Sequence, residues 1–123
     1  MSEAQEQTYL FNWIAFARNK TPELDLLYHV PNGGSRDKRE AARLKAQGVR
    51  AGVPDLCLPV PTSQYHGLYI ELKFGRNKPS PEQVKWLEAL KRQGYKTAVC
   101  YGWEEAKDVI LNYLQGGYKK TEG

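Results

Sequence analysis

Residues 54–73, PDLCLPVPTSQYHGLYIELK, contain two short apolar runs separated by a polar loop. The first run is PDLCLPV (54–60), the second is GLYIELK (67–73), and the loop between them holds Pro61 and His66. This pattern predicts a β-hairpin, in which the two strands pair side by side. The hairpin decides the fold, because the segments before and after it have to pack against its faces and edges.

A helix and a further strand follow the hairpin. The helix is predicted to open with Ser80-Pro81-Glu82-Gln83, because proline is frequent at the first helical position, and to end at Gly94. YKTAVCY (95–101) then has the composition of a buried strand. A strand that is reached through a helix lies parallel to the strand before that helix, so 95–101 is expected to pair in parallel with 67–73.

The remaining elements complete an α/β fold with a mixed central sheet flanked by helices, in the order α-β-α-β-β-α-β-α. Proline and glycine separate the other apolar and amphipathic segments of the chain. The elements not yet described are a helix over 3–18, a short strand over 26–30, a helix over about 36–47 that Ser35 caps and Gly48 stops, and a helix over 103–114.

The composition is that of a globular domain. The chain has 123 residues, of which 41% are hydrophobic, and at this length folding buries enough surface for a core. We expect one domain over 1–115 and a flexible tail over 116–123. No apolar run approaches the ~18 residues of a membrane span, and the first residues do not resemble a signal peptide, so we expect a cytoplasmic protein. Cys57 and Cys100 lie in separate apolar runs, which argues against a disulfide scaffold or a zinc cluster.

Positive charge is concentrated in one segment. The net charge is +4, and residues 32–50 carry all of it, with six basic residues against two acidic ones. A second basic cluster, Lys73, Arg76 and Lys78, follows Glu71 closely. Basic side chains beside a glycine-rich turn suit a polyanion such as a phosphate backbone. The alternative is a solvated helix face with no partner.

Asp55, Glu71 and Lys73 form the candidate reaction centre. Side chains alternate along a strand, so Glu71 and Lys73 share one face of the second strand while Leu72 points to the other. If the hairpin strands pair, Asp55 lies across from Glu71, where both carboxylates can share an ion. Carboxylates with open positions for water and a phosphate oxygen suit Mg²⁺ or Mn²⁺. The alternative is an ordinary proline–aspartate turn and an exposed glutamate–lysine ion pair.

Three motifs occur in order along the chain. They are Gly48-x-x-x-Gly52-x-Pro54-Asp55-Leu56, Tyr69-Ile70-Glu71-Leu72-Lys73 and Ser80-Pro81-x-Gln83-x-x-Trp86-Leu87. Together with the segments 29–34 and 94–95, this set resembles the virus-type replication-repair nuclease (VRR-NUC) family of the PD-(D/E)xK nuclease superfamily. The resemblance runs from about residue 3 to residue 114, and the chain is similar to the short, stand-alone form found in phages and prophages.

The resemblance implies a restriction-endonuclease-like core that binds Mg²⁺ or Mn²⁺. It also implies a glutamate on the first helix that serves the site, for which both Glu3 and Glu6 are candidates, with Glu3 slightly favoured by the spacing to Gln7. The residues assigned to the reaction are the metal ligands Asp55, Glu71 and the Leu72 carbonyl, the catalytic Lys73, and Gln83 at the edge of the site.

Residues expected to contact DNA lie in the basic and glycine-rich segments. His29 and Asn32 precede the glycine turn and are candidates for phosphate contact, although His29 fits equally well as a polar residue that closes a strand end. Gly33 and Gly34 allow close backbone approach to a phosphate, or supply a positive φ. The candidates for phosphate contacts that position the duplex without reading its sequence are Arg36, Lys38, Arg39, Arg43, Arg76 and Lys78.

The function implied by the resemblance is metal-dependent DNA endonuclease activity. Stand-alone members of the family are similar to homodimeric resolvases of four-way junctions, so the expected substrate is branched DNA and the expected assembly a homodimer. Two alternatives are a non-specific nickase or flap nuclease of the same fold, and a DNA-binding module without catalytic activity. Trp13, Trp86 and Trp103 fall on predicted apolar faces, which places them in the core or an interface.

Overall fold

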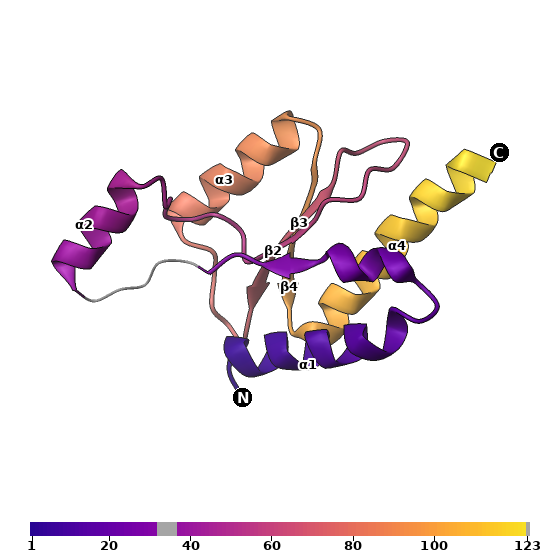
Figure 1. Ribbon diagram of the computed structural model, residues 1–123, viewed down its shortest axis with the longest axis horizontal. Helices are drawn as coiled ribbons and strands as arrows, with labels where there is room; N and C mark the ends of the chain where they lie inside the picture. Colours follow the sequence, from indigo (N-terminus) through magenta and orange to yellow (C-terminus); the bar gives the residue numbers. More distant parts are fainter. Residues whose placement is uncertain (32–36, 123) are drawn as a thin grey trace.

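The computed structural model describes residues 1–31 and 37–122, of which 116–122 are described in their backbone alone. One four-stranded sheet, in the order β1-β2-β3-β4, is surrounded by helices (Figure 1). The elements are α1 (Glu3–Ala17), a 3-10 helix η1 (Pro22–Leu26), β1 (Tyr28–His29), α2 (Lys38–Ala46), β2 (Leu56–Leu58), β3 (Leu68–Lys73), α3 (Pro81–Arg92), β4 (Lys96–Tyr101) and α4 (Trp103–Glu122).

The predicted hairpin and the predicted crossover are both confirmed. β2 and β3 pair antiparallel, with Leu56 opposite Ile70. β4 lies on the other side of β3 and runs parallel to it, because α3 returns the chain to the starting end of the sheet. The sheet is therefore mixed, and β3 is an interior strand with a neighbour on each edge.

The core lies on one face of the sheet, between the strands and the pair α1 and α4. Leu68, Ile70 and Leu72 alternate along β3 and are at most 1% exposed, and they pack with Leu10 of α1 and Ile110 of α4 in one cluster. Burial of each such side chain is worth about 1.5–3 kcal/mol, so this face fixes the register of β3. The intervening residues of β3 are consequently held on the opposite face, which carries the candidate site.

Two predicted elements differ from the structure. The apolar run at 26–30 is mostly not a strand: Pro22 opens the short helix η1, which buries Leu24, and only Tyr28 and His29 pair with β2. The last helix does not end at 114 but continues to Glu122 through a pair of glycines. Glycine costs a helix only about 1 kcal/mol relative to alanine, and no proline follows to stop it.

The second helix begins later than predicted. Its cap is Asp37, whose carboxylate accepts the N–H of Arg39 at 2.9 Å, whereas the predicted cap Ser35 lies outside the described residues. None of the residues of α2 is buried, and in Figure 1 this helix stands away from the sheet. Among the described residues, no helix has the length and apolar character needed to cross a membrane.

Candidate active site

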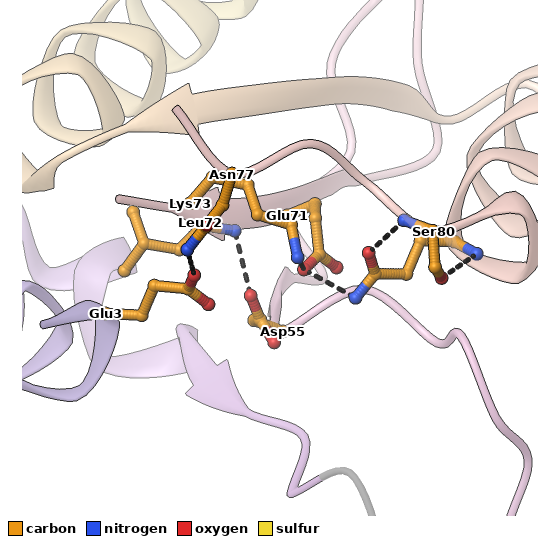
Figure 2. Close-up of polar contacts among 8 residues, drawn as sticks. Glu3, Asp55, Glu71, Leu72, Lys73, Asn77 and Ser80 are labelled. Atoms are coloured by element: carbon orange, nitrogen blue, oxygen red, sulfur yellow. Dashed lines mark hydrogen bonds and ion pairs between the residues drawn. The ribbon is translucent and has the colours of Figure 1, made fainter. Parts of the chain in front are cut away.

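The segment before β2 holds Asp55 close to β3. The N–H of Val30 donates to the Asp55 carbonyl at 2.7 Å, and the Asp55 carboxylate accepts the N–H of Leu72 at 2.9 Å (Figure 2). Continuing the pairing of Leu56 with Ile70 by one residue places Asp55 opposite Glu71. The structure thus brings together the two carboxylates that the hairpin was expected to bring together.

The Glu71 side chain is buried and uses one oxygen only. It is 1% exposed, and its Oε2 lies 3.4 Å from Lys73 Nζ and accepts the amide N–H of Gln83 at 2.9 Å. Its other oxygen, Oε1, is buried and has no hydrogen-bond partner among the described residues. A buried, unpaired carboxylate oxygen is costly, which indicates that a ligand completes its coordination.

Burial and the neighbouring Asp55 carboxylate together raise the pKa of Glu71 to about 8, against an ordinary value of 4.5, while Lys73 opposes the shift. Two carboxylates side by side in a desolvated place cannot both stay ionised at neutral pH unless positive charge joins them. Lys73, which is 8% exposed, supplies part of that charge. The electrostatics of the pair therefore favour an additional cation.

The start of α3 fixes the orientation of Gln83. The Ser80 hydroxyl accepts the Gln83 N–H at 3.2 Å, and the Gln83 Oε1 accepts the Ser80 N–H at 2.8 Å. This reciprocal capping box leaves the Gln83 amide nitrogen free to donate to Glu71. Gly52, with φ +89°, packs closely against this helix start. A Cβ at this position would come within 2.7 Å of the Glu82 backbone, so a side chain does not fit there.

The donors present fit a hard divalent cation. Asp55 and Glu71 offer carboxylate oxygens, and the Leu72 carbonyl points to the same edge of β3 as the Leu72 N–H that Asp55 accepts. Two carboxylates and a carbonyl leave positions for water and phosphate, as Mg²⁺ and Mn²⁺ require. No third Asp, Glu, His or Cys joins the pair to form a metal-binding cluster within the described part of the chain.

The two candidate glutamates of α1 have different surroundings. Glu6 is 7% exposed, and its Oε1 accepts the N–H of Trp103 at 2.8 Å, so it satisfies the first turn of α4. Glu3 accepts an N–H of Asn77 at 3.0 Å. Figure 2 shows this contact beside Leu72. Each glutamate thus accepts one hydrogen bond within the fold, and both remain candidates for the site.

Apart from His29, the residues predicted to contact DNA lie on α2, in the loop after β3, or outside the described residues. Lys38, Arg39 and Arg43 are exposed on α2, and Arg76 and Lys78 are exposed in the loop after β3. Neither ion pair that joins two described residues involves any of these side chains. The predicted contacts that lie outside the described residues are Asn32, Gly33, Gly34 and Arg36.

His29 is exposed at the end of β1, where its Nδ1–H donates to the Asp55 carbonyl at 3.1 Å. A carbonyl only accepts, so this contact fixes the tautomer and favours a role for His29 at the strand end. Sequence reasoning missed Asn77, the partner of Glu3, because a lone asparagine in a polar loop carries no signal. Trp86 is half-buried and does not belong to the hydrophobic core cluster.

Comparisons with known proteins show the family of the chain. The model of the VRR-NUC domain family matches residues 1–104. The chain belongs to the VRR-NUC family. A solved structure described as a VRR_NUC domain protein is similar to this chain with a TM-score of 0.81 and 33% sequence identity, over 95% of this chain and 91% of that one. No curated protein matches the chain.

Membership of the VRR-NUC family confirms the fold and the broad class of function expected from the motifs. The mixed four-stranded sheet flanked by helices is shared with the VRR_NUC neighbour, and the superfamily assignment is consistent with it. The family implies a nuclease-type, DNA-processing function.

Proposed function

We propose that this VRR-NUC protein is a metal-dependent DNA endonuclease that hydrolyses phosphodiester bonds and leaves 5′-phosphate and 3′-hydroxyl ends. The observation that carries the proposal is the unpartnered, buried Glu71 Oε1 beside the Asp55 carboxylate. Most buried polar side-chain atoms have a hydrogen-bond partner, so an unpaired carboxylate oxygen supports a place for a ligand. A site for a cation that also contacts phosphate explains why one oxygen lacks a partner.

Asp55, Glu71 and the Leu72 carbonyl would hold the cation, which we take to be Mg²⁺ or Mn²⁺. When bound, such an ion supplies positive charge to the scissile phosphate and makes water more acidic. Asp55 is held for this role by the Leu72 N–H, and Glu71 by Gln83 and Lys73. These contacts therefore position the two metal-binding carboxylates and leave Glu71 Oε1 available for the cation.

Lys73 is the proposed catalytic lysine. Its ammonium group lies 3.4 Å from Glu71 Oε2, on the same face of β3, and its stem is buried. An ammonium fixed at this place can orient the attacking water and stabilise the negative charge that develops on the phosphate. The Gln83 amide donates to the same oxygen, Glu71 Oε2, and holds the carboxylate in position beside Lys73.

The proposed substrate is branched DNA, with a four-way junction as the leading case, and the proposed assembly is a homodimer. Two-fold symmetry supplies two cuts at related positions, which a junction requires. The basic residues on α2 and after β3 are exposed and suit contacts to the phosphate backbone. A non-specific nickase or flap nuclease uses the same reaction centre and differs only in substrate.

The test is a cleavage assay on labelled four-way junction, flap and linear duplex, with Mg²⁺, Mn²⁺ or a chelator. Glu71→Gln is the site variant, and Glu88→Gln, an exposed carboxylate on α3, is the matched control. Paired cuts in the junction that the chelator and Glu71→Gln abolish, and Glu88→Gln does not, support the proposal. Equal cutting of all substrates contradicts junction preference, and binding without cutting supports a non-catalytic module.

A further inference from the structure

A groove of about 830 Å³ lies between α2 and the first turns of α3. Trp86 lines it, together with Leu44 and Ala41 of α2 and with Val49 of the following loop. The three tryptophans were expected in the core or an interface, and they differ in their surroundings. Trp13 and Trp103 pack against the core cluster, whereas Trp86 does not belong to it. The groove thus combines an indole ring with an aliphatic wall.

The charges in the groove suit a phosphate. Lys45 and Arg50 line it against the single carboxylate of Glu82, so two cations face one anion. The exposed Arg39 and Arg43 lie on the same helix, α2. Glu82 adds a hydrogen-bond acceptor, which fits an amino group on a base. An aromatic ring, an apolar wall, two cations and one acceptor are the groups that a nucleotide requires.

The groove adjoins the reaction centre. Gln83, whose amide donates to Glu71 Oε2, and Ser80, which caps Gln83, both line it. A ligand in the groove therefore lies one side chain away from the candidate metal site. Because the groove and the candidate metal site adjoin, a nucleotide next to the scissile phosphate could lie in the groove. The expected ligand of the groove is therefore a part of the substrate.

We propose that the groove binds one unpaired nucleotide beside a DNA branch, with its base on Trp86 and its phosphates toward Lys45 and Arg50. This inference rests on the proposed nuclease function and deepens it, because it names what distinguishes branched DNA from duplex. A groove of this volume has room for a ligand of small-molecule size. A single nucleotide has that size, whereas the paired bases of a duplex are not free to enter.

The test uses the whole protein with a chelator, so that DNA is bound and not cut. The probe is a duplex with a single-stranded branch that carries 2-aminopurine at the first unpaired position, compared with a duplex in which the same base is paired. Stacking on an indole quenches 2-aminopurine fluorescence. We expect quenching with the branched probe and none with the duplex, a measurement on the wild-type protein that requires no variant.

Two pairs of variants test the contacts. Trp86→Ala removes the ring, and Phe16→Ala removes an aromatic side chain that is 80% exposed on α1. We expect Trp86→Ala to abolish the quenching and to raise Kd for the branched probe about tenfold, the effect of losing one base–aromatic stack, with less than a twofold change for duplex. Trp86→Phe restores most of the affinity, and Phe16→Ala changes neither value.

The basic residues of the groove are tested with two double variants that each remove two positive charges. The double variant Lys45→Gln with Arg50→Gln is compared with Lys91→Gln with Arg92→Gln, two exposed basic residues at the end of α3. The first is expected to weaken branched binding several-fold more than the second. An equal loss of affinity for the branched probe and for the duplex would overturn the proposal. A groove variant that dissociates a dimer without changing the affinity for DNA would overturn it as well. Failure of cleavage alone would contradict the nuclease proposal and leave this binding result standing.

Discussion

The Gln83 amide donates to Glu71 Oε2 at 2.9 Å while its own oxygen accepts the Ser80 N–H at 2.8 Å. The second contact means that the amide cannot turn over, since rotation would put two donors face to face. Glu71 therefore always receives a donor from α3 on the same oxygen. The start of a helix thus determines which glutamate oxygen remains for a cation.

Replacement of Ser80 tests this arrangement. Ser80→Ala removes the hydroxyl that accepts the Gln83 N–H, and loss of such a cap destabilises a protein by about 1 kcal/mol. We expect in addition a several-fold rise in the Mn²⁺ concentration needed for half-maximal cleavage, with Ser80→Thr close to wild type in both. A stability loss without any change in the Mn²⁺ dependence would show that the cap serves the helix alone.

The raised pKa of Glu71 predicts how stability changes with pH. The folded protein holds a proton on Glu71 up to about pH 8, whereas the unfolded chain releases it near 4.5. Glu71 therefore contributes stability that is fully present below about pH 4.5 and is lost as the pH rises to 8. Urea unfolding of metal-free protein at pH 5.5, 7 and 8.5 is expected to show this decline.

Glu71→Gln supplies the control for that decline, because it removes the titrating group and keeps the shape of the side chain. The difference in unfolding free energy between wild type and Glu71→Gln is expected to grow with pH, to the disadvantage of the wild type. A difference that stays constant from pH 5.5 to 8.5 would contradict the assignment.

Removal of the Lys73 ammonium is expected to separate catalysis from binding. Lys73→Ala should lower the single-turnover cleavage rate by about 10²–10³-fold, as loss of a preorganised charge at a reaction centre does. Junction affinity should change little, since Lys73 is nearly buried and one phosphate contact at most is lost. If gel-shift affinity fell as far as the cleavage rate, Lys73 would be a DNA-binding residue.

The two glutamates of α1 are expected to fail in different ways. Glu6→Ala leaves the partly buried N–H of Trp103 without its acceptor and should reduce stability by about 1 kcal/mol. Glu3→Gln should leave the melting temperature unchanged and lower the cleavage rate several-fold. The reverse pattern, with activity lost only in a folded Glu6→Gln protein, would move the site glutamate to Glu6.

The exposed cations of α2 are expected to bind phosphates without reading sequence. Arg39→Gln with Arg43→Gln should weaken binding to every DNA tested and reduce the slope of log K against log salt by about 2, roughly one per contact. Fluorescence anisotropy at several salt concentrations measures this slope. An unchanged slope would mean that these side chains face solvent in the complex.

The sheet was predictable because its signals are local. The alternation in GLYIELK assigned Leu72 to the core and Glu71 to the other face, and the helix between two strands required a parallel pair. The 3-10 helix over 22–26 was not predictable, because a short apolar run fits either a strand or a buried turn. The extension of α4 beyond residue 114 was not predictable, because a pair of glycines is typical of a helix end and this helix continues through one.

The sequence predicted which residues form the candidate site, and it did not predict the hydrogen bonds between them. The motifs placed Asp55 and Glu71 together, but the capping box that points Gln83 at Glu71 depends on side-chain rotamers that spacing does not specify. The different surroundings of Glu3 and Glu6 likewise depend on distant contacts, since the partner of Glu6, Trp103, is 97 residues away in the chain. Such long-range contacts leave no periodic signal in a sequence.

The central claim is that Asp55 and Glu71 hold a cation that cleavage requires. Its most direct test is the single-turnover cleavage rate of a labelled four-way junction across a Mn²⁺ titration, for wild type, Glu71→Gln and the control Glu88→Gln. The account predicts saturating, Mn²⁺-dependent cleavage by wild type and Glu88→Gln, and none by Glu71→Gln at any concentration. Cleavage by Glu71→Gln at the wild-type rate, or by wild type in a chelator, would contradict it.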